Sequence, residues 1–316
     1  MTTAPDPAAR RHAAAAILAS FRLAPPDGGL EHAIRGDGFP VVALHGGLGG
    51  WDQSALLAHL LCRDLPVRAI AVSRPGHLGS PAGHGRTAAE QADAVVRLLD
   101  RLAVGRALVA AISGGGPTAL ALAERHPHRI AGLILVSAAT DRLMPNLPLR
   151  FSLMRFAARF PGLLGWLAAR DAADPAAADR RGLPDPIARA RVLGDPDTAA
   201  ALSALRATLF DRMAERLPGL DIDLAVCAAR RTPGFATLDL PSLIVHAVDD
   251  PVVPHAFSAA LAEAIPGAEL LSLPTGGHMA LFVHRAAIAA RVAVLVERLA
   301  QSAGRMRTCT SEGRAV

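Results

Sequence analysis

The sequence predicts an α/β fold: a doubly wound, mostly parallel sheet covered by helices on both faces, with a helical segment inserted. Three observations support this. Short aliphatic runs alternate with amphipathic segments, the alternation stops between residues 140 and 238, and glycine-rich turns follow several of the runs. With 316 residues, of which 51% are hydrophobic and 19% charged, the chain can bury a large core.

Six runs are expected to form buried parallel strands, because each is short, aliphatic and bounded by turn residues. They are residues 41–44, 68–72, 107–111, 133–136, 243–248 and 270–273. Residues 87–102 and 118–125 have the apolar spacing of amphipathic helices. Strands linked by such helices form βαβ units, which build a parallel sheet. We therefore predict a core domain of residues 1–139 and 239–300, with a helix at its N-terminus.

Residues 140–238 are helical in pattern, punctuated by proline, and contain no predicted strand. We expect them to form a helical cap over the core. Phe156, Phe160 and Trp166 are a large share of the few aromatic residues in the chain. They form either the small core of the cap or, together with Leu48, part of an apolar substrate pocket. Residues 301–316 are polar and lack periodicity, so we expect a disordered tail.

The charge pattern argues against a nucleic-acid-binding protein. The net charge is +5, but all 33 basic residues are arginines, scattered singly rather than in phosphate-tracking runs. Three cysteines far apart, at positions 62, 227 and 309, suggest neither a disulfide framework nor a zinc cluster. They fit a reducing, cytoplasmic compartment.

No stretch of about 20 apolar residues is free of charge, so we expect no membrane span. Arg10 and Arg11 precede a weak apolar run, which predicts an amphipathic surface helix rather than an export signal. No metal-ligand spacing or dinucleotide fingerprint is present. We therefore expect a small-molecule substrate and no cofactor, and the sequence leaves a homo-oligomer open.

The strongest local motif is a serine framed by small residues at the end of a strand. Ser113 follows an aliphatic run, with Ala111 two positions before it, Gly115 two positions after it, and a helix starting near Pro117. Strand and helix pass so closely at a nucleophile elbow that only small residues fit those two positions. A glycine-rich turn could instead bind phosphate. Against that, no lysine follows and no G-x-G-x-x-G spacing is present.

A second glycine-rich turn, residues 46–50, follows the first predicted strand and His45. Glycines at a strand end let backbone N–H groups turn toward a ligand, as an oxyanion hole for acyl transfer requires. We assign Gly47 and Gly114 as the two donors. His45 is expected to shape the loop rather than act as a base.

These motifs together resemble the α/β-hydrolase fold superfamily from about residue 30 to residue 300. The resemblance rests on six segments in the expected order: His45-Gly46-Gly47, Ser73-Arg74-Pro75-Gly76-His77, the turn at Ser113, Arg125-His126-Pro127, Asp249-Asp250-Pro251-Val252-Val253-Pro254, and Gly276-Gly277-His278. Within the superfamily, the sequence is similar to the esterase-like group with a helical cap after the sixth strand. Members of that group hydrolyse esters, lactones, amides or certain C–C bonds.

The resemblance implies a catalytic triad of Ser113, Asp250 and His278, in the chain order of this fold. The family places its acid after the strand at residues 243–248, and its base after the last strand. Asp249 and Asp141 are alternatives for the acid. Among other histidines, we expect His246 to be packed inside a strand, and positions 255 and 284 to lie at the surface.

The implied function is that of a serine hydrolase that cleaves carboxylic esters with small to medium apolar groups through an acyl-enzyme. A C–C bond hydrolase, an amidase or peptidase, and a cofactor-free perhydrolase would share the same triad. From another class, a receptor could use the fold to capture a small ligand without turnover.

Overall fold

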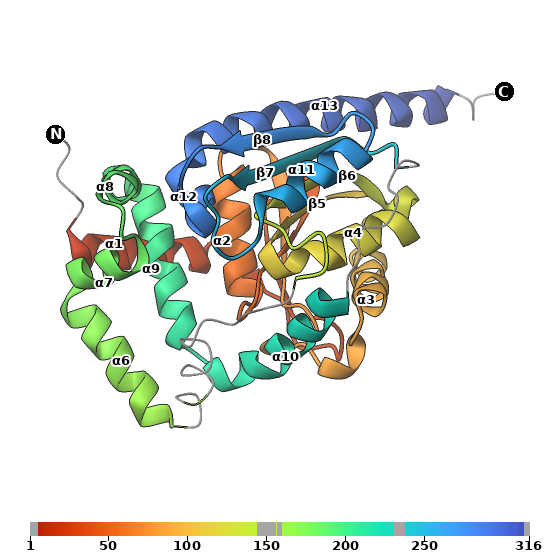
Figure 1. Cartoon of the computed structure of the whole chain (residues 1–316). Coiled ribbons are helices and arrows are strands. Elements are labelled where there is room, and N and C mark those ends of the chain that lie inside the picture. The colour runs from red at the N-terminus through yellow and green to blue at the C-terminus, as the bar shows by residue number, and fades with distance from the viewer. Residues whose placement is uncertain (1–5, 144–155, 157–159, 230–237, 313–316) are drawn as a thin grey trace.

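An eight-stranded sheet runs through the molecule in the order β1-β2-β4-β3-β5-β6-β7-β8 (Figure 1). The computed structural model describes residues 6–143, 156, 160–229 and 238–312. The strands are β1 Arg22–Leu23, β2 His32–Arg35, β3 Phe39–Leu44, β4 Val67–Val72, β5 Ala107–Ile112, β6 Ile130–Val136, β7 Ser242–Ala247 and β8 Glu269–Leu273. Strands β3 to β8 are mutually parallel and correspond to the six predicted runs, with ends shifted by up to three residues. The predicted fold class is confirmed.

Two edge strands were not predicted. Strand β2 pairs antiparallel with β4, with His32 opposite Val72, and β1 pairs antiparallel with β2. These strands contain two and four residues, which is too short for a period-two hydrophobic pattern to stand out. The conformation of β2 depends on the sheet edge offered by β4, a partner more than 30 residues away along the chain, and β1 in turn pairs with β2.

Both faces of the sheet are covered, as alternation along the strands requires. The covering helices are α1 Pro7–Ala19, α2 Trp51–Cys62, α3 Ala88–Arg101, α4 Gly116–Arg125, α11 His255–Ala264, α12 Ala280–Val283 and α13 Arg285–Glu312. Val41 and Ala43 pack into one buried cluster with residues of α2 and α13, whereas Val42 and Leu44 pack into the other with α3 and α4. Helix α3 begins at a capping box formed by Thr87 and Glu90, as its sequence favours.

Helices α6 to α10, which we call the helical segment, lie between β6 and β7. They are α6 Pro161–Ala173, α7 Pro175–Gly182, α8 Pro186–Gly194, α9 Pro196–Phe210 and α10 Met213–Ala229. The first four begin with proline, and Asp174, Asp185 and Asp195 cap α7, α8 and α9. Figure 1 shows α6, α7 and α9 gathered beside α1 at one side of the molecule, while α10 lies apart from them. Proline and aspartate therefore divide this region into short helices.

The C-terminal residues differ from expectation. Helix α13 continues to Glu312, so residues 301–312 are helical rather than an irregular tail. A helix already anchored by its buried residues Ile288 and Val292 extends at low cost, because only nucleation is unfavourable.

Within the described residues, no single helix is long and apolar enough to cross a membrane. One bent pair, Gly277–Val283 with Arg285–Ser302, has the required length and composition jointly, with 72° between its two parts.

Candidate active site

The predicted site residues follow four different strands, and the sheet brings them to one edge. His45 and the glycine turn follow β3, Ser113 follows β5, Asp250 follows β7, and His278 follows β8. Because these strands are parallel, their carboxyl ends all lie at the same edge. Ligand sites of doubly wound sheets form there, outside the carboxyl ends of the strands.

Ser113 has the strained backbone that a nucleophile elbow requires. Its φ is +52°, in the left-handed region that non-glycine residues avoid, and it starts the 3₁₀ turn η2 Ser113–Gly115 that leads into α4. A Cβ on Gly115 would lie 2.8 Å from the carbonyl oxygens of both Leu44 and His45. Strand β3 thus approaches the turn so closely that only glycine fits at position 115.

Ser113, His278 and Asp250 form one hydrogen-bonded chain. The Ser113 Oγ lies 3.1 Å from His278 Nε2, and His278 Nδ1 lies 2.9 Å from Asp250 Oδ2. A carboxylate only accepts hydrogen bonds, so Nδ1 carries the proton and Nε2 is free to accept the serine proton. The three residues are far apart in sequence and are brought together in the predicted order.

The Asp250 carboxylate is fully buried and held in its charged form. Burial alone would raise its pKa, but hydrogen bonds from His246 and His278 and from the Val252 N–H lower the pKa below its ordinary value. The Val252 and Val253 N–H groups donate to Oδ1 at 2.8 and 3.1 Å. His246 is packed inside β7, as expected, and its Nε2 lies 3.3 Å from Asp250 Oδ2.

Asp249, the neighbouring candidate acid, contacts the loop that carries the histidine. Its carboxylate accepts from the N–H groups of Gly277 at 2.8 Å and Gly276 at 3.2 Å. Asp141 follows β6, and its Oδ1 accepts from the Arg142 N–H at 2.6 Å. The carboxylate that contacts His278 is that of Asp250.

The turn after β3 is held by two buried side chains that point its peptide groups in fixed directions. The Gly46 carbonyl accepts from Arg74 Nη2 at 3.1 Å and from His45 Nδ1 at 2.6 Å. His45 Nε2 in turn accepts from the Arg74 N–H at 3.0 Å, so the ring is neutral and protonated on Nδ1. Burial, aided by the charge of Arg74, holds the pKa of His45 well below its ordinary value.

This arrangement fixes the direction of the next backbone donor. The Gly46 carbonyl and the Gly47 N–H belong to one planar trans peptide and therefore point in opposite directions. The Gly47 nitrogen lies 3.4 Å from the position that a Cβ on Gly114 would occupy. The two glycines assigned as donors are thus neighbours, beside Ser113.

Arg74 also connects this turn to the helical segment. Its Nη1 and Nη2 donate to the two carboxylate oxygens of Asp223, on α10, at 2.5 and 2.6 Å. Both side chains are at most 5% exposed. Burial raises the pKa of Asp223, and Arg74 opposes that rise. A paired, bidentate geometry of this kind is what a buried charge needs.

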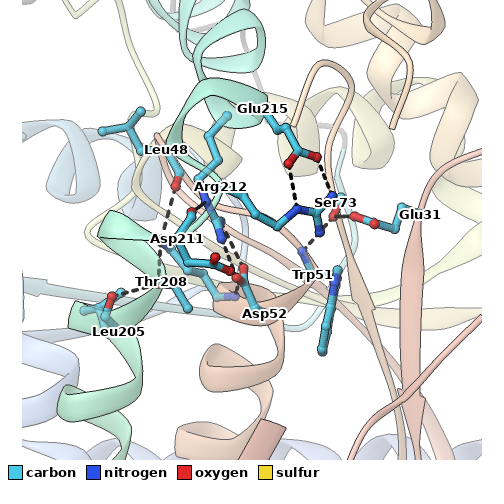
Figure 2. Close-up of polar contacts among 12 residues, drawn as sticks. Glu31, Leu48, Trp51, Asp52, Ser73, Leu205, Thr208, Asp211, Arg212 and Glu215 are labelled. Atoms are coloured by element: carbon cyan, nitrogen blue, oxygen red, sulfur yellow. Dashed lines mark hydrogen bonds and ion pairs between the residues drawn. The ribbon is translucent and has the colours of Figure 1, made fainter. Parts of the chain in front are cut away.

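A second buried ion pair holds the start of α10 against the start of α2. Arg216 donates to both carboxylate oxygens of Asp52, at 3.1 and 2.5 Å, and its Nε donates to the Asp211 carbonyl at 3.0 Å. Figure 2 shows this junction, where Asp211 lies beside Asp52. Gln53, the next residue of α2, donates to the Leu48 carbonyl at 3.2 Å. Helix α10 is therefore connected to the glycine turn through Arg74 and, less directly, through α2.

A small apolar cluster covers the glycine turn. Leu48, Leu164, Met213 and Leu220 are buried together, and a Cβ on Gly47 would lie 3.6 Å from Leu220 Cδ1. Leu48 itself has a φ of +59° and is 2% exposed. Of the four residues predicted for an apolar pocket, Leu48 is the one that lies beside the candidate donors.

The three aromatic residues predicted for the same pocket are exposed. Phe156, Phe160 and Trp166 are 55%, 49% and 58% exposed. Helix α6 buries Leu164, and a residue two positions later points about 200° away around the helix, so Trp166 faces outward. The Arg170 guanidinium lies over its ring at 5.5 Å. Phe156 and Phe160 contact each other, with ring centroids 5.2 Å apart.

Comparison with known proteins gives the family. A model of the alpha/beta hydrolase fold matches residues 40–285. The chain belongs to the alpha/beta hydrolase fold family. It is 33% identical over 252 residues to a pimeloyl-[acyl-carrier protein] methyl ester esterase of Aromatoleum aromaticum, over 77% of this chain and 92% of that protein. It is 28% identical over 262 residues to the uncharacterized hydrolase YcgS of Bacillus subtilis, over 80% of this chain and 89% of that protein.

A solved structure is similar over nearly the whole length. The alpha/beta hydrolase fold protein from Nakamurella multipartita is 30% identical and superposes with a TM-score of 0.70, over 89% of this chain and all of that chain. In the part of the chain that the structure describes, no group of three or more His, Cys, Asp or Glu side chains could hold a metal ion.

Sequence reasoning missed the partners of the glycine turn. Arg74 lies within a segment that carries the family resemblance, but nothing in that segment indicates a partner 149 residues later. Asp223 and Leu220 lie on a helix whose sequence has no motif of its own. Their role follows from the docking of α10 on the core.

Proposed function

We propose that this protein is a serine hydrolase that cleaves carboxylic esters with small to medium apolar groups through an acyl-enzyme. The observation that carries the proposal is the hydrogen-bonded chain from Ser113 through His278 to Asp250. Such a chain raises the nucleophilicity of a serine, which is a weak nucleophile when it is not activated. The similarity to a methyl ester esterase supports ester cleavage.

In the proposed reaction, the Ser113 Oγ attacks the carbonyl carbon of the ester while His278 Nε2 takes the serine proton. Asp250 keeps Nδ1 protonated and stabilises the imidazolium that forms. When the tetrahedral intermediate collapses, the C–O bond to the alcohol breaks, and His278 returns the proton to the leaving oxygen. Water then repeats the sequence on the acyl-enzyme, releasing the carboxylic acid and restoring Ser113.

The oxyanion of the intermediate would be stabilised by the N–H groups of Gly47 and Gly114. The peptide between Gly46 and Gly47 is already oriented by Arg74 and His45, so little reorganisation is needed when charge develops. The N-terminus of α4, directly after η2, adds a favourable dipole.

The helical segment would act as the cap predicted for residues 140–238, with α10 as its part closest to the reacting bond. Leu220 of α10 and Leu48 provide apolar surface beside Gly47, which favours uncharged acyl or alcohol groups. One methylene in a fitted pocket changes specificity by about 1–3 kcal/mol, so chain length should matter.

A series of p-nitrophenyl esters from acetate to dodecanoate tests the proposal, with a p-nitroanilide, a lactone and a charged succinyl ester beside it. We expect kcat/KM to peak at a short or medium acyl chain and to disappear in Ser113→Ala. Activity should survive EDTA, because the proposed chemistry uses no metal. Faster cleavage of the anilide would favour an amidase. Turnover of none of these, with a folded protein and stoichiometric ligand binding, would favour a receptor.

A further inference from the structure

A cavity lies between α1 and the helical segment, away from the proposed triad. Its volume is about 580 Å³, and it is lined by the start of α1, by α6, α7 and α9, and by the first residues of α10. Figure 1 shows these four helices α1, α6, α7 and α9 gathered at one side of the molecule. None of Ser113, Asp250 and His278 lines it. Its volume is within the range of small-molecule sites.

One wall of the cavity carries an arginine pair with an unbalanced charge. Arg10 of α1 donates to Asp179 Oδ2 at 3.0 Å, and Arg206 of α9 forms an ion pair with Oδ1 of the same carboxylate. Arg10 is 6% exposed and the Arg206 side chain is 17% exposed. Two guanidinium groups share one carboxylate, which leaves one positive charge in a buried place. Burying an uncompensated charge is costly.

The same pair has hydrogen-bond donors to spare. Among the described residues, no acceptor contacts Arg10 Nε or Arg206 Nη2, and both nitrogens are buried. Both arginines line the cavity, whereas Asp179, the carboxylate that they share, does not. The lining of the cavity therefore includes the two cations of this cluster but not its anion.

The other charged residues at the cavity do not cancel the excess positive charge of Arg10 and Arg206. Arg11, Arg212, Asp171 and Asp211 also line it. Arg212 forms an ion pair with Glu215, and Asp171 accepts from Arg181 at 2.6 Å. The two lining residues that remain, Arg11 and Asp211, have equal and opposite charges, so the excess positive charge of Arg10 and Arg206 over Asp179 remains and favours an anion.

The remaining wall is apolar. It is formed by Leu164, Ala168, Ala172, Ala207, Phe210 and Met213. A ligand that fits both parts has one anionic group and an unbranched aliphatic body. We propose that this cavity binds an aliphatic carboxylate of medium chain length, with the carboxylate at Arg10 and Arg206 and the chain along α6 and Phe210. The proposal goes beyond ester hydrolysis and does not depend on it.

Calorimetric titration of the full-length protein with decanoate tests the proposal, with decanol as the uncharged match. We expect saturable decanoate binding that is weakened about tenfold or more in Arg206→Met, while decanol binding is unchanged. Arg206→Met leaves Asp179 paired with Arg10, so the substitution leaves no buried charge without a partner. Arg180→Met, an exposed arginine of α7 that does not line the cavity, is the matched control.

A second variant separates this cavity from the triad region. Ala168 is half-buried and lines the cavity, so Ala168→Phe should fill it, keep its charge, and abolish binding of both decanoate and decanol. Absence of saturable decanoate binding to the wild-type protein would overturn the proposal. So would equal affinity in Arg206→Met, or decanoate binding that survives Ala168→Phe in a protein with an unchanged melting temperature.

Discussion

The proposed triad and the glycine turn of the candidate active site are held in place by different contacts. Ser113, Asp250 and His278 lie on loops after β5, β7 and β8, and the hydrogen bonds of the chain run between those loops. The glycine turn after β3 is instead fastened through Arg74 to Asp223, on a helix between β6 and β7. The core assembles the proposed nucleophile, whereas one of the two proposed oxyanion donors, the Gly47 N–H, depends on how α10 docks.

This difference has a consequence for catalysis. Substitutions in the triad should remove the chemistry whatever α10 does. Substitutions at the Arg74 and Asp223 contact should leave the nucleophile in place and weaken stabilisation of the transition state. Kinetic constants can separate the two effects, because loss of stabilisation that is specific to the transition state lowers kcat and leaves KM nearly unchanged.

The largest effect is expected from Ser113→Ala and His278→Ala. Each should lower kcat on an activated ester by a factor on the order of 10⁶, because nucleophile and base act as a unit. The measurement is steady-state hydrolysis by purified variants with melting curves that match the wild type. Retention of a tenth of the activity by either folded variant would mean that the substituted residue is not the nucleophile or the base.

Asp250→Asn should lower kcat by a factor on the order of 10⁴, because it holds His278 in the wrong tautomer. Asp249→Asn is the matched control in the adjacent position, and it should cost about tenfold through the Gly276 and Gly277 N–H contacts. Asp141→Asn, at the other candidate acid position, should cost no more. If Asp141→Asn were inactive and Asp250→Asn active, the acid would follow β6 instead of β7.

Asp223→Asn tests whether the contact between α10 and Arg74 orients the proposed oxyanion donor Gly47. It removes the charge that holds Arg74, so the Gly47 N–H loses part of its fixed direction, and we expect kcat to fall by up to about 100-fold at similar KM. Affinity for a trifluoromethyl ketone inhibitor should fall by the same factor as kcat/KM. Glu215→Gln, exposed on the same helix, is the control. A lower melting temperature with unchanged kcat would assign Asp223 a purely structural role.

The smallest effect concerns acid stability at His77, whose ring contacts that of His45 with 4.5 Å between the centroids. Burial, aided by the charge of Arg74, holds the pKa of His77 well below its ordinary value. The unfolded chain therefore binds more protons as the pH falls below about 6.5, and the free energy of unfolding decreases by up to about 1.4 kcal/mol per pH unit for one such histidine.

Urea denaturation at pH 7 and pH 5 measures this effect. His77→Gln should lose less stability between the two pH values than the wild type does, and His128→Gln, at an exposed position, should behave like the wild type. An equal loss in all three proteins would show that His77 is not held neutral in the folded state.

The sequence was sufficient for the parts of the molecule that local chemistry determines. Aliphatic runs predicted the parallel strands, and the small residues around Ser113 predicted a tight turn because steric demands act within a few residues. The edge strands β1 and β2 are too short for their pattern to be recognised. The outward direction of Trp166 could not be inferred, because it depends on which face of α6 packs against α9.

Contacts between distant segments could not be predicted from the sequence either, because they depend on how helices pack. Asp223 pairs with Arg74, 149 residues away, and Asp179 is shared by Arg10 and Arg206 from two other helices. One charged residue on a helix gives no sign of its partner. The proposed triad is an exception, since its order after successive strands is a property of the family.

Covalent labelling with diisopropyl fluorophosphate, read by intact-protein and peptide mass spectrometry, tests the central claim most directly. The Ser113 Oγ should displace fluoride, so the wild-type protein gains one diisopropylphosphoryl group on the peptide containing Ser113. His278→Ala should be labelled far more slowly, and Ser113→Ala should not be labelled. A folded wild-type protein that stays unlabelled, or a Ser113→Ala protein labelled at another serine as fast as the wild type, would contradict the account.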